Sequence, residues 1–207
     1  MGGALNVSVD GEDLILTSWV DNDVRIWNQQ SQEIKWKKAE LLAPVSATRY
    51  GNLIVVAEHG RQRVIGINEE GEVVTIFADN LPAPTGLAVE GGALYVSDRS
   101  LGQILTLAQN NEPLSKPRIV AEGLESPEGF VWYEDKIIVI EADRGHVTLV
   151  EGANKIHLAN IPPGSQAASD LQPPSQVFNG ITVDREGNFY IPGETNRVLY
   201  KLSNPFQ

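Results

Sequence analysis

Apolar and polar residues alternate along most of the chain, in short runs separated by turn residues. The clearest example is residues 84–107, PTGLAVEGGALYVSDRSLGQILTL, in which a Pro-x-Gly start leads into alternating runs joined by a Gly-Gly turn and a polar loop. A period of two residues puts successive side chains on opposite faces of a strand, and Gly-Gly suits a hairpin turn. Because no segment keeps a 3.6-residue apolar period for more than about two turns, we predict antiparallel strands and little or no helix.

The same pattern recurs at a nearly constant spacing. Gly11, Gly51 and Gly91 are 40 residues apart, and further copies start at Pro127 and Phe178. A fourth run follows the third in the first four copies, at residues 33–38, 72–78, 118–121 and 155–159. Four short strands in a repeat of about 40 residues are typical of a propeller blade.

We therefore predict an all-β fold, a β-propeller with five recognisable four-stranded blades, as a single domain over residues 1–207. The blades are expected at about 4–43, 44–83, 84–126, 127–177 and 178–207, the last without its outer strand. Residues 162–176, PPGSQAASDLQPPSQ, match no strand or helix pattern. We expect them to form a lid or specificity loop above the start of the fifth inner strand.

Two sets of residues are expected to meet at one mouth of the propeller channel. In a four-stranded blade, the inner strand starts at the face to which the second strand returns. The first set is the Pro-x-Gly position of each inner strand: Ser46, Thr85, Glu128 and Asn179. The second set follows the second strand: Glu58-His59, Asp98-Arg99, Glu141 and Asp143-Arg144. These carboxylates either build a site or accept backbone N–H bonds from the neighbouring turns.

The composition narrows the range of functions. The formal net charge of −11 argues against nucleic-acid binding and against attachment to anionic membranes, and it leaves carboxylates for cations. No cysteine is present, which excludes disulfides, thiolate metal sites and a Cys nucleophile. Gly-x-Ser-x-Gly, His-Glu-x-x-His and phosphate-binding glycine motifs are absent as well. Trp19, Trp27 and Trp36 are expected to pack between blades, with sugar stacking as the alternative.

The sequence gives little information on location in the cell. The first residues form neither a basic segment nor a continuous apolar segment, and no apolar run is long enough to span a bilayer. We expect a soluble chain and assign no compartment.

Several segments resemble known propellers. Residues 126–142, SPEGFVWYEDKIIVIEA, and 178–202, FNGITVDREGNFYIPGETNRVLYKL, resemble blades of the senescence marker protein/gluconolactonase-like family. Residues 84–98, PTGLAVEGGALYVSD, resemble the related NHL-repeat propellers. In the lactonases, inner strands supply Glu, Asn and Asp oxygens to one divalent cation, usually calcium, at the channel mouth. Glu128 and Asn179 match those positions, whereas Ser46 and Thr85 depart from them.

The first function hypothesis follows from this resemblance. It is a metal-dependent hydrolase of a small cyclic ester, acting at the channel mouth on a small-molecule substrate. The expected metal ligands, of calcium above all, are Glu128, Asn179, Asp98 and Glu58; the catalytic residues are Glu141 and His59; the substrate-binding residues are Arg99, Arg144 and Asn179.

The alternative is a non-catalytic propeller that binds a protein or a carbohydrate on its acidic face, and another enzyme class such as a lyase remains open. The ring itself also leaves two possibilities. The resembling families mostly have six blades, but only five copies are present. We expect a chain derived from a six-bladed plan that self-associates through its incomplete edge, the alternative being a ring closed by five blades.

Overall fold

The computed structural model describes residues 5–161, 180–193 and 198–206. In them, short antiparallel strands form five sheets, which we call blades 1 to 5. Blade 1 consists of β1 (Asn6–Asp10), β2 (Asp13–Ser18), β3 (Asp23–Asn28) and β4 (Ile34–Lys38). Blade 2 consists of β5 (Pro44–Tyr50), β6 (Leu53–Glu58), β7 (Arg63–Ile67) and β8 (Val73–Ala78), with the 3₁₀ helix η1 (His59–Arg61) between β6 and β7.

The remaining three blades follow in chain order. Blade 3 consists of β9 (Pro84–Glu90), β10 (Ala93–Asp98), β11 (Gln103–Gln109) and β12 (Glu112–Ala121). Blade 4 consists of β13 (Pro127–Tyr133), β14 (Lys136–Glu141), β15 (His146–Glu151) and β16 (Asn154–Asn160). In the described residues, blade 5 has three strands, β17 (Thr182–Val183), β18 (Phe189–Gly193) and β19 (Val198–Leu202). Residues 162–176, for which we expected a lid loop, lie outside the described part of the chain.

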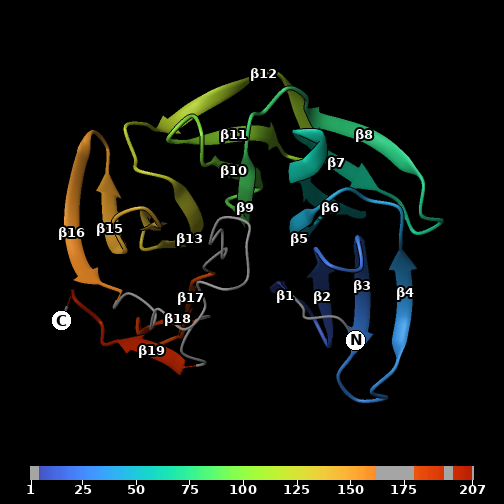
Figure 1. Cartoon of the computed structure of the whole chain (residues 1–207), viewed down its shortest axis with the longest axis horizontal. Helices are drawn as coiled ribbons and strands as arrows, with labels where there is room; N and C mark the ends of the chain where they lie inside the picture. Colours follow the sequence, from blue (N-terminus) through green and yellow to red (C-terminus); the bar gives the residue numbers. More distant parts are fainter. Residues whose placement is uncertain (1–4, 162–179, 194–197, 207) are drawn as a thin grey trace.

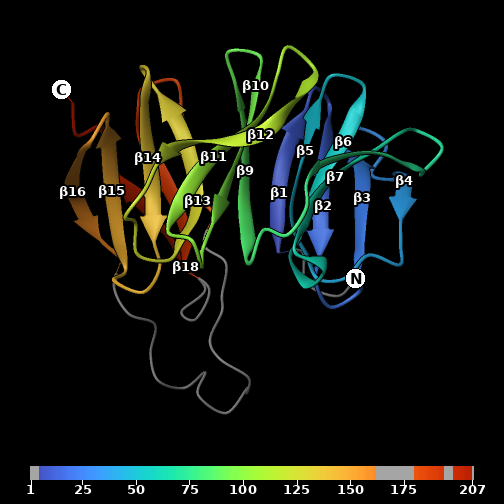
Figure 2. The same cartoon turned by 90° about the horizontal axis from the view of Figure 1, so that it is seen from above.

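The sheets follow one another around a common centre (Figure 1). The first strand of each sheet faces the centre, and β4, β8, β12 and β16 form the rim. In the view from above, the strands run between the two faces of the disc (Figure 2). The predicted all-β propeller with little helix is confirmed.

Apolar side chains from alternate strand positions fill the spaces between neighbouring blades. On β6, Ile54 and Val56 point to blade 1, where they pack on Ile15. Val55, between them in sequence, points the other way and packs with Leu94 of blade 3. The two faces of blade 2 therefore belong to two separate cores, one shared with blade 1 and one with blade 3, as a two-residue period requires when both faces of a sheet are covered.

The face of blade 1 that points away from blade 2 is partly exposed. Val7 and Val9 on β1 have 54% and 72% of their surface exposed. Ala47, 40 residues after Val7, is only 1% exposed because blade 1 covers it. Within the described residues, no helix is long and apolar enough to cross a membrane.

Candidate active site at the channel mouth

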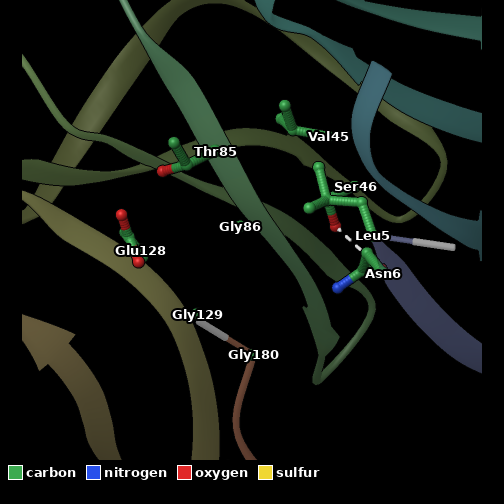
Figure 3. Close-up of a pocket in the computed structure, with 9 residues that line it drawn as sticks. All are labelled: Leu5, Asn6, Val45, Ser46, Thr85, Gly86, Glu128, Gly129 and Gly180. Atoms are coloured by element: carbon green, nitrogen blue, oxygen red, sulfur yellow. Dashed lines mark hydrogen bonds between the residues drawn. The ribbon is translucent and has the colours of Figure 1, made fainter. Parts of the chain in front are cut away.

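The inner strands bring a small set of residues together at the centre of the propeller (Figure 3). They line a half-open cavity of about 20 Å³, roughly the space that one water molecule needs. The residues that line it come from β1, β5, β9 and β13 and from the segments next to β1 and β17: Leu5, Asn6, Val45, Ser46, Thr85, Gly86, Glu128, Gly129 and Gly180. The expected meeting of Ser46, Thr85 and Glu128 at one place is confirmed.

Close packing of β9 against β13 fixes the position of Glu128. A Cβ atom on Gly86 would lie 2.5 Å from the carbonyl oxygen of Glu128, so the close approach of β9 to β13 at this point requires glycine. Ser97 Oγ donates a 2.6 Å hydrogen bond to that same oxygen, and Thr85 Oγ1 donates a 3.0 Å bond to the carbonyl of Pro127. The backbone of Glu128 is thereby held from blade 3.

A charged network leads from this cavity to the solvent. Glu128 is 1% exposed, and its Oε1 lies 3.3 Å from Nη1 of Arg99. Nη2 of Arg99 donates a 3.0 Å bond to Oδ1 of Asp143, and Ser126 Oγ donates a 2.5 Å bond to Oδ2 of Asp143. These two contacts, Ser126 first and Arg99 second, lower the pKa of Asp143 below its ordinary value. Arg99 thus connects the buried Glu128 of blade 4 with the exposed Asp143 of the β14–β15 loop.

Three of the expected site carboxylates, Glu58, Asp98 and Glu141, hold loops together. None of them is among the described residues that line the cavity. Each accepts a bond from a backbone N–H just before the inner strand of its own blade: Glu58 from Leu42 (2.7 Å), Asp98 from Ala83 (3.0 Å) and Glu141 from Glu125 (2.7 Å). These are the hydrogen bonds expected if the carboxylates accept backbone N–H bonds from neighbouring turns, which was the alternative to a shared site.

The second oxygen of these carboxylates is also engaged. Oδ1 of Asp98 accepts a 2.9 Å bond from the backbone N–H of Leu101. Oε1 of Glu141 accepts a 2.5 Å bond from Thr148, and Oε2 of Glu58 lies 2.6 Å from Nε of Arg63. Metal binding by these groups would require most of these contacts to break.

The other predicted residues lie at separate places on the mouth face. His59 begins η1, and its Nδ1 lies 3.2 Å from the carbonyl oxygen of Pro84, a hydrogen bond when Nδ1 carries the proton. Arg144 forms an ion pair with Glu125. Asn179, expected as a metal ligand and a substrate contact, lies outside the described residues.

Sequence reasoning did not single out Ser126, and it placed Asp143 at the mouth beside Arg144 without naming it as a site residue. The available signal was positional. Ser126 precedes the inner strand of blade 4, and Asp143 follows the second strand of the same blade. Each therefore lies at one of the two kinds of position that meet at the mouth.

The described residues do not by themselves fit a calcium site. Calcium takes about six to eight oxygen ligands. Of the described residues that line the cavity, Glu128 is the only carboxylate, and the positive charge of Arg99 lies next to it. Within the described residues, no group of three or more His, Cys, Asp or Glu side chains could hold a metal ion.

Comparison by sequence identifies no relative. No protein-family model matches the chain, and no curated protein matches it.

Comparison by structure finds propellers. The crystal structure of a nidogen/laminin complex contains a chain with a TM-score of 0.78 and 14% identity, and the match covers 97% of this chain and 76% of that one. A gluconolactonase from Xanthomonas campestris has a TM-score of 0.67 and 16% identity, over 93% of this chain and 72% of that one. Virginiamycin B lyase from Staphylococcus aureus has a TM-score of 0.63 and 12% identity, and the match covers 95% of this chain and 68% of that one. At such identities the likeness establishes a common fold.

Proposed function

We propose that this propeller hydrolyses a small cyclic ester at its channel mouth. The observation that carries the proposal is the buried carboxylate of Glu128, which lines a cavity of about the size of one water and lies 3.3 Å from a guanidinium nitrogen. A gluconolactonase is among the propellers with a similar structure. These observations support a lactone as the substrate class.

Glu128 acts as the general base in this proposal. A water molecule in the cavity transfers a proton to the carboxylate of Glu128 as its oxygen attacks the ester carbonyl carbon. The C–O bond of the ring then breaks, the proton passes to the leaving alkoxide, and the product is a hydroxy acid. Arg99 donates a hydrogen bond to the carbonyl oxygen while negative charge develops there.

The substrate lies at the mouth and outside the cavity, because about 20 Å³ is too small for a lactone ring. The side chains of Arg99 and Asp143 are 17% and 60% exposed, so both can contact a ring at this position. Asp143 holds the guanidinium of Arg99 from the solvent side. His59 and Arg144, in neighbouring loops of the same face, are the proposed further contacts.

Hydrolysis of an aldonolactone panel tests the proposal. We expect Glu128→Gln to lower kcat/KM by about 100-fold or more, because a general base contributes at least that much and the amide keeps the packing. Glu134→Gln, at an exposed turn residue, is the matched control and should retain activity. Absence of turnover by the unaltered chain, or full turnover by Glu128→Gln, contradicts the proposal.

The resemblance also implies a divalent cation, calcium, with Glu128 and Asn179 as ligands. If the ion binds the folded chain there, millimolar calcium raises the melting temperature by mass action, and Glu128→Gln removes the rise. A melting temperature that does not respond to calcium would leave a metal-independent hydrolase.

The second candidate is a non-catalytic propeller that binds a protein at the same face. The observation in its favour is a group of exposed apolar side chains in mouth-side loops: Trp19 (38% exposed), Val20 (77%), Leu42 (46%) and Leu101 (44%). A matching structure is a nidogen/laminin complex, which adds support. Absence of turnover over the whole lactone panel favours this candidate.

A further inference from the structure

A larger cavity is lined by residues of blades 1 and 2, the two blades on the right of Figure 1. Its volume is about 280 Å³. Asp13 begins β2, Lys35 is near the start of β4, and Arg49 is near the end of β5. These ends of the strands belong to the face opposite the Pro-x-Gly starts. The cavity is therefore separate from the channel mouth and shares no residue with the proposed active site.

Four charged residues line this cavity; Asp13, Lys35 and Arg49 are engaged in ion pairs, and the fourth, Glu69, is exposed to solvent. Nζ of Lys35 lies 3.0 Å from Oδ1 of Asp13, and Nη2 of Arg49 lies 2.8 Å from Oδ2 of Asp10. An ionic ligand would have to break one of these pairs and lose its own hydration, which is costly. A neutral ligand can instead use the remaining donor and acceptor capacity of the same groups, since a guanidinium has five N–H groups and a carboxylate about four acceptor positions.

The inner wall of the cavity is apolar. Trp36 lines it together with Ile26 and Ile54. Nε1 of Trp36 donates a 2.9 Å hydrogen bond to the carbonyl oxygen of Glu69 of blade 2, which fixes the orientation of the indole. An aromatic ring held in place contacts a ligand at little cost in conformational entropy.

We infer that this cavity binds a neutral polyhydroxylated ligand of about one sugar ring. The volume of about 280 Å³ is near the lower end of small-molecule pockets, about 300–1,000 Å³. A sugar ring offers C–H groups to the apolar wall at Trp36. Its hydroxyl groups accept hydrogen bonds from Arg49 and Lys35 and donate to Asp13.

Nuclear magnetic resonance titration of the full chain tests the inference. The probes are the methyl glycosides of glucose, galactose and mannose. We expect at least one of them to shift the indole N–H resonance of Trp36 in a saturable way. Trp36→Leu and Arg49→Gln should each weaken binding about tenfold or more, whereas Trp19→Leu, in a loop of the opposite face, should bind like the unaltered chain. Unfolding by urea checks that each variant is folded.

Three results overturn the inference. One is the absence of a saturable shift with all three glycosides. Another is equal affinity in the unaltered chain and in a folded Arg49→Gln variant. The last is tighter binding of glucose 6-phosphate than of methyl glucoside, because it would mark an anion site. Glu128→Gln should bind the glycoside like the unaltered chain, so this result is independent of the proposed activity at the mouth.

Discussion

The carboxylate of Asp98 illustrates how a single residue can stabilise the mouth without taking part in chemistry. Its side chain is completely buried, and its two oxygens accept bonds from the N–H groups of Ala83 and Leu101. Asp98→Asn replaces one acceptor by an NH₂ group that faces an N–H donor. We expect the free energy of unfolding to fall by about 1–3 kcal/mol, measured by urea denaturation.

The control for this variant is Asp79→Asn, at an exposed aspartate in the β8–β9 connection. It should change stability by less than about 0.5 kcal/mol. A loss of stability in the control equal to that in Asp98→Asn would refute the loop-holding role. The two variants together separate residues that shape the mouth from Glu128, whose replacement is expected to affect turnover.

At the scale of an element, the β17–β18 turn depends on Asp184. Asn188 and Tyr190 donate hydrogen bonds to Oδ2, and backbone N–H groups of Glu186 and Asn188 donate to Oδ1. These bonds, with the side chain of Asn188 as the largest cause, lower the pKa of Asp184 from 3.8 to about 2. The stabilisation is therefore fully present above about pH 4 and is lost as the pH falls through about 2.

Asp184→Asn should accordingly destabilise the chain at neutral pH. The free energies of unfolding of the variant and of the unaltered chain should approach each other near pH 2, where Asp184 is becoming protonated. Urea midpoints of both proteins along this pH range measure the difference. Asp135→Asn, in the exposed β13–β14 turn, is the control for removing one negative charge from a turn. A difference between Asp184→Asn and the unaltered chain that stays constant with pH would rule out the ionised form as the cause.

The strand β12 is longer than the sequence analysis predicted. We expected an outer strand at residues 118–121, whereas β12 runs from Glu112 to Ala121 and includes Pro113 and Pro117. The strand is outermost in its sheet, and its pairing with β11 has two register shifts. An outer strand tolerates proline because one side of its backbone needs no partner in the sheet.

At the scale of the whole molecule, the exposed face of blade 1 leads to a prediction about assembly. Val7 and Val9 expose apolar surface, although Ala47, the counterpart of Val7 in the next repeat, is covered by a neighbouring blade. We expect this face to pair with a second copy of the chain, because apolar patches on sheets are rarely left in water. Light scattering should give about twice the monomer mass of 22.6 kDa.

Val9→Lys should shift the population toward monomer, since a charge would be buried in the contact. Val74→Lys, at a 52% exposed position of β8 on the rim, is the matched control and should leave the assembly unchanged. A clean monomer with cooperative unfolding at working concentrations would show that the chain does not need a second copy.

Much of this molecule can be predicted from the sequence. A two-residue period and a repeat of about 40 residues are local properties, so they determine strands, blades and the residues at the start of each inner strand. Thr85 and Glu128 share one position in the repeat, directly after the proline, and Ser46 follows its own proline by two residues. These positions at the start of the inner strands predict that the three residues meet at one cavity.

Only the tertiary structure decided which partner each side chain meets. The repeat places Glu58, Asp98 and Glu141 at one face, but the direction of a carboxylate depends on whether a loop N–H or the channel lies closer. Arg99 and Glu128 belong to different blades, and their 3.3 Å contact arises from the packing of blade 3 on blade 4. Periodicity fixes the face on which a residue lies, whereas hydrogen bonds and ion pairs depend on distances between segments that the sequence separates.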